Sequence, residues 1–197
     1  ATLVSLQVVL AGTDTVAIDA GDVPLPASGN YSIIANFDAE GTPTLTVFEN
    51  DTSAIDAGNG RLQVRHTAAA PAVDVKADGA VAFSDLSNPK EAKADLPAAT
   101  YSVEVVPTGA DKPVVIGPAD IAVVDGESLI VYAVGSLDDE TLTVLTESIT
   151  GLGAAPDAVE TGNSPIDNGM SMTAVAGMLV IATIAVGGGL VLSRRSN

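Results

Sequence analysis

The chain of 197 residues contains no cysteine and no tryptophan, and aromatic residues make up only 3% of it. Without cysteine there can be no disulfide, no thiolate metal ligand and no thiol catalysis, so a folded domain must rely on packing alone. Basic residues are also scarce, with 8 Lys and Arg against 25 Asp and Glu and a net charge of −17. So acidic a surface repels phosphates and anionic lipid headgroups, which argues against nucleic acid as a partner.

The apolar content is high, at 47% of the residues, and consists mainly of Ala, Val, Leu and Ile beside 19 Gly. Cores of this kind are typical of β-branched strands packed with small residues. Apart from an apolar segment near the C-terminus, roughly 150 residues remain, enough for one large or two small domains. The chain opens with Ala1, which fits a mature form whose signal peptide was cut after a small residue.

That C-terminal segment runs from Thr173 to Leu192 without a charge, and Arg194 and Arg195 follow it. At about 1.5 Å per residue, a helix of this length covers the roughly 30 Å hydrocarbon layer of a membrane. We therefore expect a transmembrane helix at 170–193 and a tail at 194–197. The positive-inside rule places that tail in the cytoplasm and the rest of the chain outside.

One face of this expected helix carries mostly small residues, namely Ala174, Gly177, Ile181, Ala185 and Gly188. Small residues let helix backbones approach closely in lipid, so this face indicates packing against another membrane helix. The alternative is that Ala and Gly are simply common in membrane helices. The preceding stretch, 151–169, is rich in Gly, Pro, Asn and Asp, which predicts a flexible linker.

The N-terminal part contains an internal repeat. At an offset of 97 residues, and without gaps, residues 5–50 match residues 102–147; for example, Thr44-Leu45-Thr46-Val47 matches Thr141-Leu142-Thr143-Val144. A constant offset indicates two copies of one structural unit.

The repeated stretches alternate apolar and polar residues and are rich in β-branched ones, which predicts strands. The expected strands are Leu3 to Leu10, Tyr31 to Phe37, Leu45 to Phe48, Arg61 to His66, Ala72 to Ala77, Ala80 to Phe83, Tyr101 to Val106, Leu129 to Val134 and Leu142 to Leu145. Asp78-Gly79 between two of them predicts a hairpin. The fold class is therefore all-β, with tandem antiparallel immunoglobulin-like sandwich units plus one C-terminal transmembrane helix.

The first unit looks incomplete, because residues 61–96 of the second unit have no counterpart before Ala1. We expect a partial repeat at 1–57 and a complete sandwich at 58–150. Either a longer precursor continues upstream, or a partial sheet is appended to one full sandwich. An incomplete sheet leaves an open edge that recruits strands, so residues 1–57 are a candidate docking surface unless they are paired within the chain.

The run Gly60-Arg61-Leu62-Gln63-Val64-Arg65-His66, continued as Thr67-Ala68-Ala69-Ala70-Pro71-Ala72-Val73-Asp74-Val75, resembles a widespread domain of unknown function, DUF4397. Asp78-Gly79 and the later Leu96-Pro97-Ala98 before Tyr101 extend the resemblance over about residues 1–150. The resemblance implies a secreted or surface bacterial protein of tandem β-sandwiches, without an assigned activity. Members are common in actinobacteria and haloarchaea, and the modest acidity here favours an actinobacterial source. The loop after His66 lacks the acid usual in the family, which weakens any metal site there.

His66 is the only histidine, and the sequence supplies no nucleophile or orienting acid for it. We expect His66 and Asp74 to be structural anchors of their loop. The acidic turns at Asp138-Asp139-Glu140 and at Asp38 with Glu40 lack the spacing of a calcium loop, so solvated turns are expected and a weak cation site is the alternative. No phosphate loop or hydrolase motif is present. We expect no catalytic, cofactor-binding or metal-binding residues and no small-molecule substrate.

Three functions remain open. The first is a non-catalytic accessory subunit that contacts an integral membrane protein complex through its helix and acidic domain, a respiratory supercomplex being one candidate. The second is a stand-alone cell-surface binding or adhesion module. The third, an enzyme, would need a polar cluster around His66 that the sequence does not supply.

Overall fold

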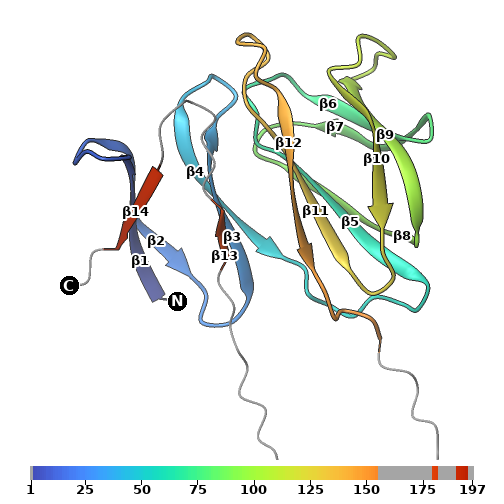
Figure 1. Ribbon diagram of the computed structural model, residues 1–197, viewed down its shortest axis with the longest axis horizontal. Helices are drawn as coiled ribbons and strands as arrows, with labels where there is room; N and C mark the ends of the chain where they lie inside the picture. Colours follow the sequence, from blue (N-terminus) through green and yellow to red (C-terminus); the bar gives the residue numbers. More distant parts are fainter. Residues whose placement is uncertain (1, 155–178, 182–189, 195–197) are drawn as a thin grey trace, which may run out of the picture.

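The computed structural model describes residues 2–154, 179–181 and 190–194. Throughout these residues the regular structure consists of β-strands (Figure 1). The strands are β1 Thr2–Leu10, β2 Val16–Leu25, β3 Asn30–Phe37, β4 Pro43–Asn50, β5 Asn59–His66, β6 Val73–Ala77, β7 Ala80–Leu86, β8 Glu91–Pro97, β9 Ala99–Pro107, β10 Ile116–Val123, β11 Ser128–Val134, β12 Thr143–Ile149, β13 Leu179–Ile181 and β14 Leu190–Arg194. The all-β prediction is confirmed.

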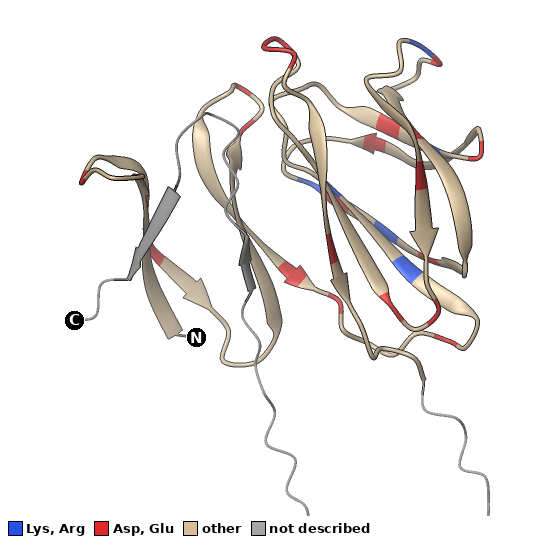
Figure 2. Ribbon diagram, in the orientation of Figure 1, with Lys and Arg blue, Asp and Glu red and all other residues tan. Residues whose placement is uncertain are grey.

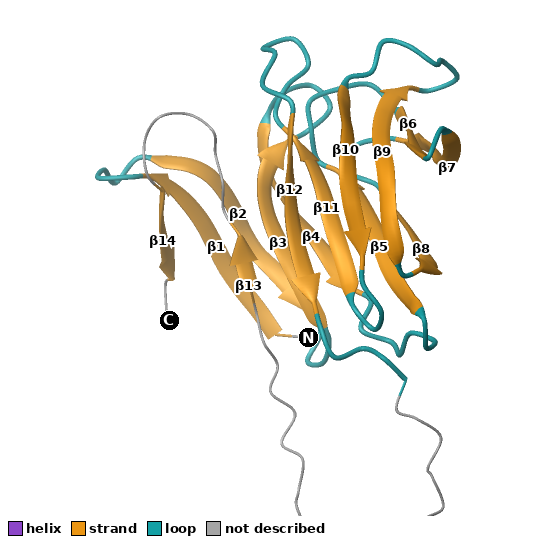
Figure 3. Ribbon diagram, turned by 45° about the vertical axis from the view of Figure 1, so that its right-hand side comes forward, coloured by secondary structure: helices purple, strands orange, loops and turns teal. Residues whose placement is uncertain are grey.

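The strands form four sheets, in the orders β14-β1-β2, β13-β3-β4, β12-β11-β5-β8 and β10-β9-β6-β7. The sheets follow one another across the molecule, with β1 and β2 at one end and β6 and β7 at the other (Figures 1 and 3). Three apolar clusters lie between successive sheets. They contain Val8, Ile18 and Ala35; Ile34, Phe48, Ile130 and Tyr132; and Leu62, Val64, Val73, Val75, Leu86, Val105 and Val123.

Residues 59–149 form a sandwich of two four-stranded sheets around the largest of these clusters. The predicted hairpin between β6 and β7 is confirmed, since Asp78 and Gly79 both adopt positive φ, of 49° and 81°. Two positive φ values in a two-residue loop are the mark of a type I′ turn. The predicted antiparallel pairing holds for most strands, but β5 pairs with β11, and β13 with β3, in parallel.

Residues 2–50 form two hairpins, β1 with β2 and β3 with β4. At the offset of 97 residues these four strands correspond to β9, β10, β11 and β12. Strands β5, β6, β7 and β8 have no counterpart among residues 2–50. Within residues 2–50, therefore, the first unit has half the strands of the second.

The free sides of β1 and β3 are nevertheless partly covered. β13 pairs with Ser32–Ile34 of β3 in parallel, and β14 pairs with Leu6–Leu10 of β1 in antiparallel orientation. The predicted docking surface required an open edge along residues 1–57. Over these stretches, the edge is instead occupied by the chain's own C-terminal segment.

β13 and β14 fall within the predicted transmembrane helix, whose other residues lie outside the described part of the chain, as do Ala174, Gly177, Ala185, Gly188 and Arg195. The two described pieces of 170–193 are strands; β13 includes Ile181, and β14 extends to Arg194. Among the described residues there is no helix of the length and apolarity needed to span a bilayer. The start of the predicted linker is fixed, since Ile55 N–H donates to Leu152 O at 2.8 Å and Ala154 N–H to Ile55 O at 2.9 Å.

Charge divides unevenly between the two units. Residues 2–57 contain no Lys or Arg, whereas Asp and Glu occur on both units. In Figure 2 the blue residues all lie on the second unit, several of them along β5 and β8. The first unit is therefore acidic throughout, and the basic residues 61–112 belong to the sandwich beside it.

Candidate functional site

The joint between the two units is built around Arg65, a β5 residue whose side chain is fully buried, at 0% exposure. Its Nε donates to Glu91 Oε2 at 2.9 Å, its Nη1 to the Tyr132 hydroxyl at 2.7 Å and its Nη2 to Asn50 Oδ1 at 2.8 Å. The guanidinium also lies over the Phe48 ring, 4.4 Å from the centroid. A single cation thus bonds to β8 and β11 of the second unit and to β4 of the first.

Further polar groups extend this joint. The Tyr132 hydroxyl donates to Glu147 Oε2 at 2.8 Å, and Ser32 Oγ donates to the same oxygen at 3.1 Å. Burial raises the pKa of Tyr132 to about 12, so the phenol stays protonated and keeps donating. The network joins two units that already share the apolar cluster around Phe48 and Tyr132. Its groups satisfy one another, which marks a structural joint.

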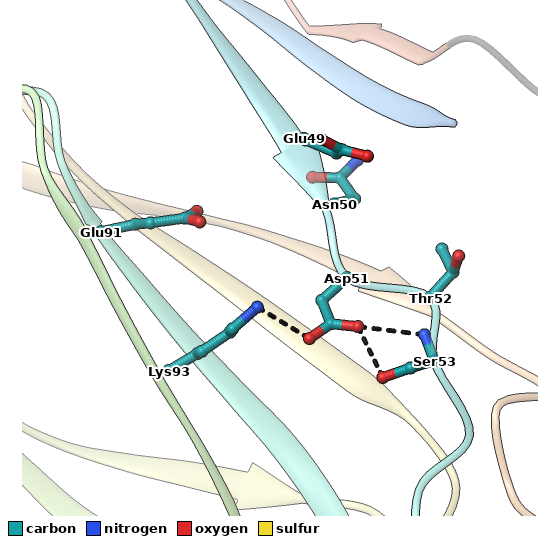
Figure 4. Close-up of a pocket in the computed structure, with 7 residues that line it drawn as sticks. All are labelled: Glu49, Asn50, Asp51, Thr52, Ser53, Glu91 and Lys93. Atoms are coloured by element: carbon teal, nitrogen blue, oxygen red, sulfur yellow. Dashed lines mark hydrogen bonds and ion pairs between the residues drawn. The ribbon is translucent and has the colours of Figure 1, made fainter. Parts of the chain in front are cut away.

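At the edge of this joint, a groove of roughly 480 Å³ lies between the end of β4 and the start of β8. Figure 4 shows its lining: Glu49, Asn50, Asp51, Thr52, Ser53, Glu91 and Lys93. The Asp51 carboxylate accepts from Lys93 Nζ at 2.7 Å and from Ser53 Oγ at 2.6 Å. It also forms an ion pair with Arg61, 3.1 Å away, whose own fork binds Asp95.

The groove is polar, and its central charges neutralise one another. The hydrogen bond from Lys93 holds the pKa of Asp51 well below its usual range, and the bonds from Ser53 lower it further. Asp51 is therefore a fixed carboxylate and a poor general base. Lys93 is half-exposed and forms an ion pair with Asp51. Glu91 accepts a hydrogen bond from Arg65. The arrangement ties β4 to β5 and β8, and the Ser53 hydroxyl bonds to the Asp51 carboxylate, a poor general base.

His66, the residue on which the enzyme hypothesis depends, is 1% exposed. Its Nε2 lies 3.1 Å from the Pro71 carbonyl oxygen, which makes Nε2 the protonated nitrogen. Burial lowers the pKa of His66, so the ring is neutral near pH 7. A substrate cannot reach it without opening the sandwich.

Asp74 lies on β6 and accepts two backbone N–H bonds, from Asp85 at 2.8 Å and from Gly109 at 2.9 Å. The bond from Asp85, then that from Gly109, lowers the pKa of this carboxyl group. Asp74 thus bonds to β7 and to the turn after β9, whereas the loop after His66 is held by the imidazole. The structure does not bring the two residues to one site.

The acidic turns have different local structures. Asp38 caps its own turn by accepting from the backbone N–H groups of Glu40 and Thr42, at 3.0 and 2.7 Å. At Asp138-Asp139-Glu140, the Asp139 N–H donates to Ser136 Oγ at 3.2 Å. No three His, Asp or Glu side chains are grouped to hold a metal ion within the described ranges.

Sequence reasoning missed Arg61, Arg65, Tyr132 and Glu147 as members of the joint. A signal was present in β5, where Arg61, Gln63 and Arg65 alternate with Leu62 and Val64. Strand alternation places the first set on one face and the second on the other. Both faces are buried, because the first unit covers the polar one, and that contact was not visible in the sequence.

Comparison with known proteins agrees with the resemblance seen in β5 and β6. The chain matches no curated protein and no solved structure. Residues 4–76, which run from β1 to β6, match the family model described as a domain of unknown function, DUF4397. The matched range is shorter than the resemblance suggested and crosses the boundary between the two units. The protein is thus a DUF4397 domain-containing protein.

Proposed function

We propose that this protein is a non-catalytic, membrane-anchored accessory subunit, which attaches to a larger membrane protein complex on the outer face of the membrane. Its β units would lie outside, residues 170–193 would cross the bilayer as a helix, and the tail would lie in the cytoplasm. The observation that carries the proposal is that the first unit has, within residues 2–50, half the strands of the second unit. Residues 2–57 supply no strands equivalent to β6 and β5 for the edges of β1 and β3, where only β14 and β13 of the C-terminal segment pair.

Strand edges bind other chains by main-chain hydrogen bonding, and pockets for alternate side chains add selectivity. The second unit is a rigid base for such contacts, since the Arg65 joint and the Phe48 cluster fix β3 and β4 to it. The first unit also carries eight acidic residues and no basic one in 2–57. A partner with basic flanks to its docking strands would be attracted to it.

The described polar groups fit this role better than catalysis. His66 is buried and bonded to Pro71, and the charges of the groove are engaged with each other. An active site needs polar groups free to meet a substrate. The immunoglobulin-like type of the sandwich, and a respiratory supercomplex as the host, are finer parts of the same proposal.

The test is a mild-detergent pull-down of the full chain from its native membrane, with a tag after Asn197 and identification of stoichiometric partners. We expect recovery of a multi-subunit membrane complex. Replacing Gly177 and Gly188 by Leu should abolish it, because both lie on the small face of the expected helix. The matched control is Gly187→Leu, which lies off that face. Recovery of the tagged chain alone would refute the accessory role.

A second candidate, a stand-alone surface module that binds an envelope polymer, is favoured by one observation. β13 and β14 occupy the edges of β3 and β1 within the chain. An edge that is filled internally has no need of a partner. The same pull-down separates the two candidates, since a stand-alone module should remain monomeric and should bind isolated envelope polymer instead.

A further inference from the structure

The positions of β13 and β14 follow the architecture of the second unit. There, β5 lies beside β11 in parallel, and β6 lies beside β9 in antiparallel orientation. In the first unit, β13 lies beside β3 in parallel and β14 beside β1 in antiparallel orientation. Since β3 and β1 are the repeats of β11 and β9, the C-terminal strands take the places of β5 and β6.

The correspondence extends to single register positions. Leu179 pairs with Ser32, the repeat of Leu129, which pairs with Leu62. Leu190 pairs with Leu10, the repeat of Pro107, which pairs with Val73. Val73 lies eleven positions after Leu62, and Leu190 lies eleven positions after Leu179. Direction, partner, order and spacing thus agree for both strands.

Residue types agree as well. Four of the seven core residues of the second unit come from β5 and β6, namely Leu62, Val64, Val73 and Val75. The equivalent register positions hold Leu179, Ile181, Leu190 and Leu192, all of them aliphatic. Among the side chains that the structure describes, the cluster between β1–β2 and β3 consists of Val8, Ile18 and Ala35, with Leu45 packed against them. Aliphatic residues at these register positions are the types that β5 and β6 contribute to the core of the second unit.

Charge favours the same occupant. The first unit contains no basic residue, and β14 ends on Arg194, which lies opposite Leu6. A basic end on the added strand therefore meets an acidic unit.

We propose that the edges of β1 and β3 form a strand-accepting site whose occupants are the chain's own strands β14 and β13, in the register of β6 and β5. These two strands cannot at the same time belong to the membrane helix. Outside a bilayer they complete the first unit, and in a bilayer they leave the site open for a partner strand pair of the same pattern. The second half of this inference rests on the proposed membrane anchor; the first half does not.

The absence of native cysteine makes disulfide trapping a direct test. Gln7 and Ser193 are register partners, and their equivalents in the second unit are Glu104 and Lys76. The test chain carries Gln7→Cys with Ser193→Cys, and the matched control carries Glu104→Cys with Lys76→Cys. Paired strands bring Cα atoms to about 4.5–5.5 Å, within disulfide reach. A second control, Val4→Cys with Ser193→Cys, is displaced by roughly 10 Å along β1.

Each full chain is made by cell-free synthesis, with or without lipid nanodiscs, then oxidised and analysed by non-reducing electrophoresis and peptide mapping. Without lipid, we expect the test pair to form an intrachain disulfide within about twofold of the yield of the matched control, and the displaced pair to form little. With nanodiscs, the yield of the test pair should fall about tenfold while that of the matched control is unchanged.

The outcomes separate the claims. If the matched control forms its disulfide without lipid and the test pair does not, the strand-accepting site for 179–194 is refuted. A disulfide between chains would overturn the choice of occupant in favour of a second copy. A test-pair disulfide that persists in nanodiscs would overturn the exchange and the membrane anchor, while the strand placement would stand.

Discussion

Replacing Arg65 by Ala should release the joint between the two units. The substitution removes a fully buried guanidinium that bonds to Glu91, Tyr132 and Asn50. It leaves behind a carboxylate without its cation and a cavity beside Phe48. Removing one partner of a buried ion pair typically costs about 3–5 kcal/mol, because the remaining groups lose a partner that water cannot fully replace.

We take about 4 kcal/mol as the expected loss, since Glu91 is partly exposed and Tyr132 retains its bond to Glu147. With a urea dependence of about 2 kcal/mol per molar for a domain of this size, the midpoint of unfolding should fall by roughly 2 M. Arg65→Lys retains the charge but not the guanidinium that bonds to three groups. Its free energy of unfolding should therefore fall by at least half as much as that of Arg65→Ala.

The assay is urea unfolding of the full chain in detergent, followed by far-ultraviolet circular dichroism, with Lys93→Ala as the control. Lys93 is half-exposed and forms a surface ion pair with Asp51, so its loss should cost about 1 kcal/mol or less. If Arg65→Ala shifts the midpoint no more than Lys93→Ala does, the joint does not hold the units together.

Three further changes test other parts of the structure. The pKa of His66 is lowered by burial, so below its unfolded value of about 6.5 the unfolded chain binds more protons than the folded chain. The free energy of unfolding should therefore decrease as the pH falls from 7 to 5.5. His66→Gln should reduce this pH dependence in urea titrations. Gly60→Ala would place a Cβ against the Val124 carbonyl oxygen, so we expect the free energy of unfolding to fall by about 3 kcal/mol. At Gly79 a Cβ would meet open space but φ is +81°, so Gly79→Ala should lower the free energy of unfolding by about 1 kcal/mol. Equal shifts of the melting temperature for the two variants would contradict the close contact at Gly60. Tyr132, with its pKa raised to about 12, should not ionise in ultraviolet titrations at pH 10.5 until the protein unfolds.

Strand prediction succeeded at several strands with clean apolar alternation, and it failed where Gly or Pro broke the pattern and at β8, whose apolar positions are mostly Ala. β1, β3, β5 and β11 were located to within a residue or two, and the Asp78-Gly79 hairpin was confirmed by its two positive φ values. β2, β8 and β10 were missed, because Gly and Pro interrupt β2 and β10 and charged residues alternate along β8. These strands form through pairing with neighbours, which a local pattern does not record.

The site residues divide in the same way. His66 and Asp74 stood out as single chemical features in an apolar run, whereas Arg65 is one of several polar residues in an alternating strand. Its role depends on Glu91, Tyr132 and Asn50, which are 15 to 67 residues away along the chain. No local pattern encodes contacts at that separation.

The sequence by itself determined the all-β composition, the repeat at an offset of 97 residues, the match of residues 4–76 to the DUF4397 model and the imbalance between the two units, because each depends on residue types and their spacing. Only the tertiary structure decided that β5 lies parallel to β11, that the units share a buried cation, and that β13 and β14 lie at the edges of the first unit. These features depend on which strand edges and faces meet in space. For the apolar segment 173–192 the two levels differ: its composition predicts a membrane helix, whereas its two described pieces are strands at the edges of β3 and β1, and the disulfide test distinguishes these conformations.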